Sequence, residues 1–221
     1  MLEIVQTADG SNTIYNSLVD ENYHSRYGAL QESQHVFVNS GLRYFLDGDS
    51  ATSVSILEVG FGTGLNFLLS ADLCTEKKIQ LEYTGVEAYP LTAELIAQTA
   101  YDQYVSADIW QKFIGNYRES ALPLITLNSY CQLQIADCKL LDFQSKKQYD
   151  LIYFDAFAVA RQPEMWDETT ISHAIQFLKP GGVFVTYAIT GNLKRMLKAF
   201  GFKVEKVAGA LGKREMLRAS K

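Results

Sequence analysis

Apolar and polar positions follow two different periods along most of the chain. From residue 54 onward, short β-prone apolar runs recur at 54–60, 82–87, 131–136, 150–155, 182–188, 202–208 and 213–219. Between these runs, apolar residues at helical spacing occupy 64–73, 91–103, 107–118, 164–178 and 191–200. Strands that alternate with helices in this way form a mostly parallel sheet with helices on both faces.

The last two apolar runs are separated only by the short stretch from Ala208 to Gly212. A connection of this length permits an antiparallel hairpin and is too short for the crossover that parallel strands require. The pattern therefore predicts an α/β fold with a seven-stranded sheet, in which six strands follow by alternation and the last one is antiparallel.

The first 53 residues have a different character. Two strand-like segments, 3–7 and 13–16, flank the turn residues 9–11 and predict a hairpin. Apolar positions over 29–46 predict an amphipathic helix that is interrupted near Gly41. This part is too small to hold its own core, so we expect residues 1–53 to form an extension packed on a main domain, residues 54–221.

Composition narrows the class of protein. The 221 residues are 48% apolar and 20% charged, as in an ordinary globular domain. No apolar run approaches the roughly 20 residues that cross a bilayer, and the N-terminus lacks the features of a signal peptide. The three cysteines lack CxxC spacing and the three histidines lack metal-ligand spacing. We therefore expect a cytoplasmic protein with reduced thiols, no membrane contact and no metal.

The net charge of −5 is unevenly distributed. Residues 194–221 carry nine basic and two acidic side chains, a net charge of +7, whereas the other residues carry eleven basic and 23 acidic side chains, a net charge of −12. A basic end on an acidic protein favours local contact with a polyanion. A solvated helix face beside an edge strand protected by lysines explains the same charges equally well.

The run LEVGFGTGLNF, which begins at Leu57, contains the first candidate site. A buried strand, three alternate glycines and a helix form the turn by which α/β sheets bring backbone close to a nucleotide-like ligand. Glu58 would repel a phosphate but suits a cationic sulfonium. The run therefore favours S-adenosylmethionine (SAM) over NAD or ATP, and a tight turn without a ligand is the alternative. The cofactor-binding candidates are Glu58, Gly60, Phe61, Gly62 and Gly64.

Acidic residues follow the next two predicted strands. Glu87, with Ala88 after it, ends the second strand, where a carboxylate can accept hydrogen bonds from both ribose hydroxyls. Asp137, with Cys138 after it, ends the third strand, where an acid can bind the exocyclic amine of adenine. We therefore predict that these four residues bind the cofactor. The alternatives are a capping or surface role for Glu87 and a turn-forming role for Asp137.

The fourth predicted strand ends at Asp155, which faces the place where a methyl donor and its acceptor should meet. Methyl transfer is an in-line displacement, so the enzyme mainly has to hold and aim the nucleophile. A carboxylate can accept an N–H bond from an amine nucleophile and then take its proton. We predict that Asp155 is the catalytic residue, and the alternative is that it caps the segment after the strand.

Several stretches together resemble one known family. They are YHS at 23–25, GALQES at 28–33, HVF at 35–37, LEVGFGTGLNF at 57–67, YTGVEAYPL at 83–91, FDAFAVARQPEMW at 154–166, LKPGG at 178–182 and GKREML at 212–217. The chain resembles the methyltransferase half of MnmC, a bacterial enzyme that modifies the wobble uridine of tRNA, which also occurs as a stand-alone protein called MnmD. The resemblance implies the fold of class I SAM-dependent methyltransferases, Rossmann-like with an antiparallel last strand.

The resemblance also implies a reaction. The family methylates the primary amine of 5-aminomethyl-2-thiouridine in the anticodon arm of tRNA, with SAM as methyl donor. It implies a base pocket near Asp155, and the basic tail would contact anticodon-arm phosphates. The substrate-binding candidates are Tyr23, His24, Phe157, Pro163, Met165, Trp166, Lys213 and Arg214.

Other functions remain as alternatives. One is methylation of a small-molecule amine, and another is a SAM-binding protein without catalysis. A NAD oxidoreductase fits less well, because the dinucleotide fingerprint requires G-x-G-x-x-G. No second glycine fingerprint follows residue 65, so we expect no FAD-dependent oxidase half here. The sequence does not decide whether a separate FAD-dependent oxidase works with this chain or none does.

Overall fold

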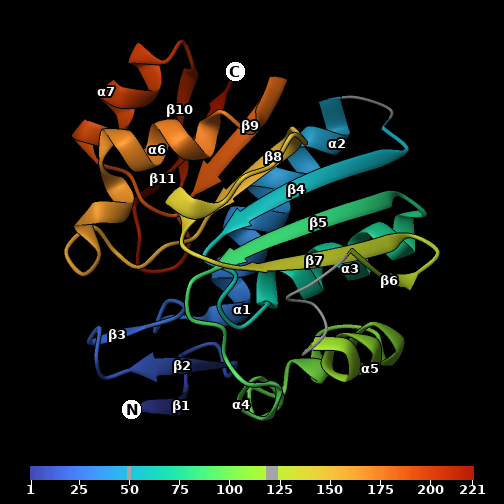
Figure 1. The fold of residues 1–221 in the computed structure, drawn as a ribbon. Coiled ribbons are helices and arrows are strands. Elements are labelled where there is room, and N and C mark those ends of the chain that lie inside the picture. The colour runs from blue at the N-terminus through green and yellow to red at the C-terminus, as the bar shows by residue number, and fades with distance from the viewer. Residues whose placement is uncertain (49–50, 118–123) are drawn as a thin grey trace.

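The computed structural model describes residues 1–48, 51–117 and 124–221. Within these residues one sheet contains eight strands in the order β10-β11-β9-β8-β4-β5-β7-β6 (Figure 1). The strands are β4 (Ser53–Val59), β5 (Gln80–Glu87), β6 (Ile125–Asn128), β7 (Cys131–Asp137), β8 (Tyr149–Phe154), β9 (Leu178–Thr186), β10 (Lys203–Ala208) and β11 (Glu215–Ser220).

The central strands β9, β8, β4, β5 and β7 are parallel, and β11 lies antiparallel between β9 and β10. The prediction of a mostly parallel sheet that ends in an antiparallel hairpin is thus confirmed. Strand β6 was not predicted. It has only four residues, two of them polar at Thr126 and Asn128, and it forms the edge of the sheet by pairing antiparallel with β7.

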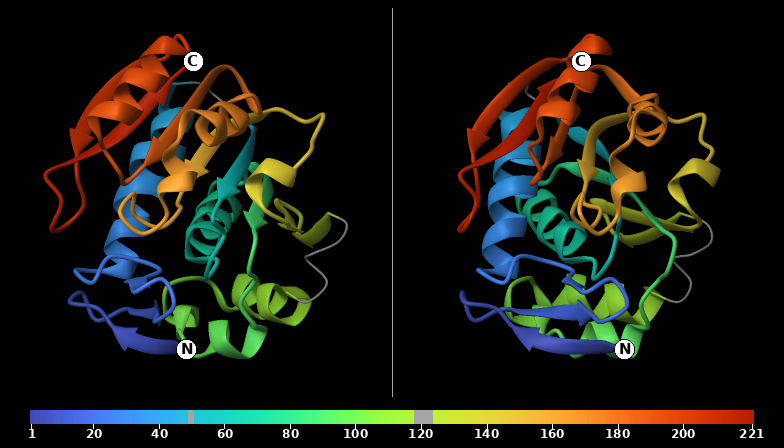
Figure 2. Two further views of the ribbon diagram at one scale, coloured as in Figure 1. Left: turned by 60° about the vertical axis from the view of Figure 1, so that its left-hand side comes forward. Right: turned by 90° about the vertical axis from the view of Figure 1, so that its left-hand side faces the viewer.

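Helices cover both faces of the sheet (Figure 2). They are α3 (Leu65–Lys77), α4 (Ala93–Ala97), α5 (Ala107–Asn116), α6 (Glu168–Ile175) and α7 (Gly191–Ala199), with 3₁₀ turns η2 (Tyr101–Gln103), η4 (Leu140–Asp142) and η5 (Pro163–Trp166). Successive side chains of a strand point to opposite faces of the sheet, so the apolar core has one part on each face. Val54 and Ile56 pack on the α3 side, whereas Leu57 and Val59 pack on the α6 side.

Two predicted helices are each divided into two elements. The predicted helix 91–103 is α4 followed by η2, because Ala100 adopts a left-handed backbone conformation (φ 56°) between them. The predicted helix 164–178 begins as η5 and restarts at Asp167, whose side chain accepts from Thr170 N and caps α6. Residue 118, the predicted end of the helix 107–118, lies outside the described residues.

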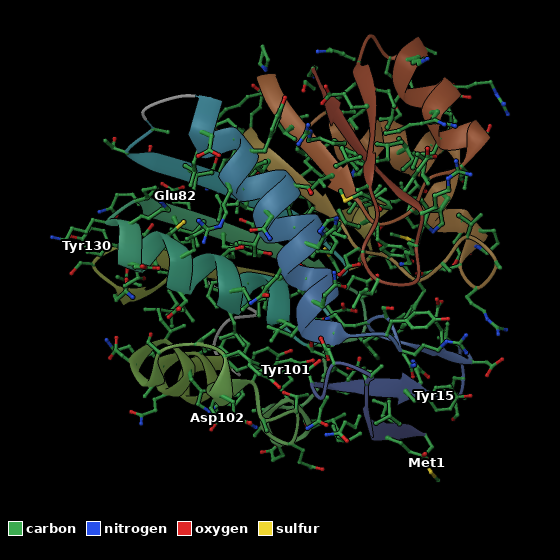
Figure 3. All side chains as sticks on the ribbon, turned by 180° about the vertical axis from the view of Figure 1, so that it is seen from behind. Met1, Tyr15, Glu82, Tyr101, Asp102 and Tyr130 are labelled. Carbon is green, nitrogen blue, oxygen red and sulfur yellow. The ribbon has the colours of Figure 1, made fainter. Side chains whose placement is uncertain are left out.

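The N-terminal residues form a small antiparallel sheet of β1 (Leu2–Gln6), β2 (Asn12–Asn16) and β3 (Glu21–Asn22), which confirms the predicted hairpin. This sheet lies below the carboxyl ends of the parallel strands (Figure 1). Tyr101 of η2 fixes it to the main fold, because its hydroxyl donates to Asn12 O at 3.0 Å (Figure 3). The division of the chain at residue 53 stays a prediction.

The helix after this sheet is continuous, so the predicted interruption near Gly41 is wrong. It comprises α1 (Ala29–Glu32), the π-helical segment η1 (Ser33–Arg43) and α2 (Tyr44–Gly48). Gly41 serves packing here. A Cβ atom at this position would lie 3.0 Å from atoms of both Tyr153 and Val185, which are fully buried in the sheet. Glycine therefore lets the helix lie directly on β8 and β9.

This contact predicts a difference between two glycines. Gly41→Leu should lower the free energy of unfolding by about 2–3 kcal/mol, because the sheet has no space for the added atoms. Gly115→Leu on α5 is the matched control, since a Cβ there meets no atom within 4 Å, and it should be neutral or stabilising by up to about 1 kcal/mol. Urea unfolding measures both, and equal effects would contradict this role of Gly41.

Candidate active site

A cavity of about 1440 Å³ opens at the carboxyl ends of the parallel strands. Its walls come from the glycine turn after β4, the segments that follow β5, β7 and β8, and residues of the N-terminal sheet. Tyr187, after β9, and Lys213, between β10 and β11, complete the lining. In open α/β sheets the ligand crevice lies at this edge, so the cavity lies where the sequence predicts a binding site.

The glycine turn has a backbone that other residues rarely adopt. Gly60, Gly62 and Gly64 have φ values of 82°, 53° and 77°. A Cβ atom at Gly60 would lie 2.4 Å from Asp155 O, so glycine allows the ends of β4 and β8 to meet. Phe61 lines the cavity, and its ring packs into the core against Phe67, Tyr83 and Phe113.

Glu87 and Ala88 line the cavity next to this turn. The two carboxylate oxygens of Glu87 accept from Gly62 N at 2.9 Å and from Tyr89 N at 3.0 Å. These bonds fix the carboxylate at the end of β5, where a ribose is expected. The Glu87 side chain thus both holds the glycine turn and presents an acid to the cavity.

The end of β7 lies beside the end of β5, since Glu87 and Asp137 are register partners in these two strands. Asp137 lines a smaller adjoining cavity of about 260 Å³ with Tyr117 and residues 90–94. Cys138 lines the main cavity, and its N–H donates to Glu87 O at 3.1 Å. The structure therefore brings Asp137 and Cys138 close to the predicted nucleoside site, with the Cys138 N–H already bonded to the protein.

Glu58 lies beneath the crevice and does not line it. It is fully buried, and its oxygens accept from Asn66 Nδ2 and Tyr83 OH, both at 2.8 Å. Strand alternation causes this position, because Glu58 shares the α3 face of β4 with Ile56. Burial, together with the nearby charge of Asp155, raises the pKa of Glu58 well above its usual value. Direct contact between Glu58 and a cofactor stays a prediction.

Asp155 shares the same amide donor. Asn66 Nδ2 also donates to Asp155 Oδ2 at 2.8 Å, so one side chain of α3 holds two carboxyl groups. Burial and the nearby charge of Glu32 raise the pKa of Asp155 to about 8, although Asn66 and Lys213 oppose this rise. Sequence reasoning did not find Asn66. Its only signal is a polar residue within the apolar first turns of α3, LNFLL.

Five of the predicted substrate-binding residues line the cavity wall: Tyr23, His24, Phe157, Met165 and Lys213. The rings of Tyr23 and Phe157 meet edge to face, with centroids 5.2 Å apart. Trp166 is buried beside this wall, and its Nε1 donates to Phe157 O at 2.8 Å. Pro163 is exposed at the start of η5 and does not line the cavity.

His24 connects the N-terminal sheet to the glycine turn. Its Nδ1 lies 3.0 Å from Thr13 Oγ1, and its Nε2 lies 3.5 Å from Thr63 Oγ1. Burial lowers its pKa to about 4, so the ring is neutral at pH 7. The side chain therefore helps to join the extension to the glycine turn.

The two predicted basic contacts lie apart. Lys213 lines the cavity, with its Nζ 2.7 Å from Glu32 Oε1 and 3.6 Å from the centre of the Tyr187 ring. Arg214 is exposed and does not line the cavity. Glu32 and Tyr187 were not predicted, because nothing in their local sequence indicates that they meet Lys213.

Metal-binding clusters and membrane-spanning helices are both absent from the described residues. Their His, Cys, Asp and Glu side chains form no group of three or more that could hold a metal ion. No helix among them has the length and apolar character that a membrane span requires.

A parallel sheet that ends in an antiparallel hairpin, with a glycine turn at its carboxyl edge, is the fold of class I SAM-dependent methyltransferases. A family profile described as S-adenosyl-L-methionine-dependent methyltransferase matches residues 97–221. The chain belongs to this family, and it is a methyltransferase domain of the MnmC type.

Known proteins resemble the chain over most of its length. It is 35% identical over 212 residues to the tRNA 5-methylaminomethyl-2-thiouridine biosynthesis bifunctional protein MnmC of Idiomarina loihiensis, covering 90% of this chain and 35% of that protein. It is 30% identical over 211 residues to the protein of the same name from Leptospira interrogans, covering 90% and 32%. The chain thus spans about a third of the length of these relatives.

A solved structure shares the fold. The crystal structure of MNMC2 from Aquifex aeolicus superimposes with a TM-score of 0.78 at 24% identity, covering 100% of this chain and 70% of that one. The predicted fold class, the MnmC-type family and the dependence on SAM are confirmed by these likenesses.

The position of His24 predicts how stability depends on pH. Between pH 6.5, the ordinary pKa, and about pH 4, the unfolded chain binds a proton at this ring and the folded protein does not. Folding stability contributed by the neutral ring is therefore lost as the pH falls through this window. His24→Gln should flatten the fall in unfolding free energy between pH 6.5 and 4, measured by urea unfolding. Parallel curves for the two proteins would contradict the burial of a neutral His24.

Proposed function

We propose that this chain transfers a methyl group from SAM to the aminomethyl nitrogen of 5-aminomethyl-2-thiouridine at the wobble position of tRNA. The observation that carries this proposal is the position of Asp155. Asp155 lies in the cavity wall just after β8, next to Gly60 of the glycine turn, and shares this cavity with the aromatic pair of Tyr23 and Phe157. The names of the relatives support the choice of nucleoside.

The chain's own residues fit SAM in the glycine-lined part of the cavity. Positive φ values and absent side chains let a nucleoside approach the turn, and Glu87 presents a fixed carboxylate there. Asp137 at the next strand end would bind the adenine amine. The cavity exceeds the 300–1,000 Å³ of common small-molecule pockets, so a second ligand can share it.

The acceptor side fits a nucleobase that carries an amine. Aromatic rings such as those of Tyr23 and Phe157 hold unstacked bases in RNA-binding proteins. SAM supplies a methyl group on a sulfonium, and the C–S electron pair stays with sulfur as the amine nitrogen bonds the carbon. Asp155 would accept an N–H bond from the amine, aim its lone pair and take the proton that the product releases. A carboxyl group with a pKa of about 8 is suited to proton transfer near neutral pH.

The proposal also concerns partners and location. A tRNA substrate places the reaction in the cytoplasm. The relatives are named bifunctional, and this chain spans about a third of their length. We infer that any oxidase step comes before the reaction at this site, because the acceptor must already carry a free amine.

A methylation assay tests the proposal. Purified protein is incubated with labelled SAM and bulk tRNA from a strain that lacks the methylation step, and the tRNA is digested to nucleosides. We expect label in 5-methylaminomethyl-2-thiouridine without any added oxidase. Label that enters only small-molecule amines, or SAM binding without turnover, would replace the proposal with one of the two alternative functions.

The Asp155→Ala variant tests the proposed catalytic group in the same assay. Turnover should fall about 10²–10⁴-fold, because the variant loses both the orienting acceptor and the proton acceptor. The dissociation constant for SAM, measured by calorimetry, should stay close to that of the wild type. Full activity in this variant would remove Asp155 from its proposed role.

Glu87→Ala tests the proposed ribose contact. We expect the dissociation constant for SAM to rise about 10–100-fold, because charge-assisted hydrogen bonds to the ribose are lost. Glu87→Gln is the matched control. Its amide oxygen can still accept from Gly62 N and hold the turn, so its loss of affinity should be smaller. Unchanged affinity in Glu87→Ala would rule out the contact.

A further inference from the structure

Lys213 is held inside the cavity by two neighbours. Its ammonium pairs with Glu32, whose side chain is only 6% exposed, and lies over the Tyr187 ring. The Glu32 carboxylate is itself fixed, because its other oxygen accepts from Ser25 N at 2.7 Å. Tyr187 OH donates to Ala156 O at 2.8 Å, directly after Asp155 in the chain. The ammonium therefore has a fixed place near the candidate catalytic group.

The loop that carries Lys213 is fixed as well. Leu211 N donates to Gln31 Oε1 at 3.1 Å, and His35 Nε2 lies 2.7 Å from Ala208 O. A Cβ atom at Gly212 (φ 82°) would lie 2.2 Å from the Tyr27 ring, so the loop passes close to the extension. The tip of the β10–β11 hairpin is thus bound to the N-terminal part of the molecule, and Lys213 is not a freely moving surface lysine.

Most of the titratable groups around Asp155 are carboxyl groups of glutamates or hydroxyl groups of tyrosines. Those that interact electrostatically with it or share its hydrogen-bond donor are Glu21, Glu32, Glu58, Tyr83, Tyr187 and Lys213. Among these six side chains Lys213 is the only cation. Glu21 accepts from Ala158 N at 3.0 Å, so the acids enclose the wall that contains Asp155 and Phe157.

This arrangement bears on a difficulty of amine methylation. An amine attacks a methyl carbon only as the free base, whereas nearby carboxylates stabilise its ammonium form. A fixed cation has the opposite effect, because it repels an ammonium and lowers the pKa of a neighbouring amine. The same cation stabilises the charged form of a carboxylate. Lys213 is placed to act on both groups at once.

We propose that Lys213 is a positioning residue for methyl transfer, whose fixed ammonium favours the neutral form of the acceptor amine and the charged form of Asp155 beside it. This inference rests on the proposed function of the site. It gives Lys213 a role inside the cavity in place of the contact with tRNA phosphates that we expected from the sequence. Glu32 and Tyr187 act through Lys213 by holding it in place.

The pH dependence of single-turnover methylation tests the proposal, with SAM and tRNA saturating. In Lys213→Met the rising limb should move up by about one pH unit, so that the rate on that limb falls about tenfold and recovers at higher pH. Lys213→Arg keeps the charge and should keep the wild-type limb. Glu32→Gln removes a negative charge and should move the limb to lower pH, which tests the electrostatics without removing the lysine.

A matched control comes from the same hairpin. Lys206→Met also removes a lysine paired with a glutamate, here Glu215 at 3.3 Å, but outside the cavity lining, and it should leave the pH profile unchanged. If Lys213 contacts phosphate instead, Lys213→Met will raise the KM for tRNA and reduce the salt slope of binding by about one, with no change in the pH profile. That outcome would overturn the proposal.

Titration of the ligand-free protein separates this inference from the proposed function. Carboxyl ¹³C resonances of aspartate-labelled protein report the protonation of Asp155, which Asp155→Asn assigns. The midpoint should rise by about one pH unit in Lys213→Met. An identical midpoint in both proteins would overturn the role of Lys213 whatever the substrate, whereas a wild type that shifts as expected but methylates no tRNA would contradict only the proposed function.

Discussion

One side-chain amide joins two acidic groups at the carboxyl edge of the sheet. Asn66 Nδ2 donates to Glu58 at the end of β4 and to Asp155 at the end of β8, and a buried carboxylate without a donor would be costly. The glycine turn makes the arrangement possible. Gly60 lets the two strand ends meet, and α3 then starts where its second residue reaches both acids. The glycine turn and the candidate catalytic group are therefore parts of a single local structure.

The alternation of strands and helices was readable from the sequence because it rests on local apolar periodicity. Strand β6 and the continuity of the first helix were not. Strand β6 is short and half polar, so only its pairing with β7 makes it a strand. At Gly41 the local propensity of glycine to interrupt a helix gives way to close packing on Tyr153 and Val185. Tertiary contacts determine both the strand β6 and the unbroken helix at Gly41, and such contacts cannot be inferred from local patterns in one sequence.

The candidate site was also predictable only where its residues follow from local strand patterns. Residues that end strands, such as Glu87 and Asp155, follow from the rule that ligands bind at the carboxyl edge. The direction of Glu58 also follows from strand alternation, which turns it to the α3 face and into the core. Glu32 and Tyr187 could not be found, because they reach the cavity from segments that are distant in sequence. Such residues carry no local signal apart from their chemistry.

The net charge of the basic C-terminal segment overstates the positive charge that is free to meet a polyanion, because several of its basic side chains are paired within the protein. Arg218 pairs with Glu205 and stacks on the Tyr44 ring at 3.4 Å, so its charge joins the last hairpin to the first helix. Lys213 is held in the cavity. Arg195 and Lys198 on α7 are exposed and remain available to solvent. Under the proposed function, exposed cations of this kind would orient a tRNA without reading its sequence, and the cavity wall around Asp155 would select the nucleoside.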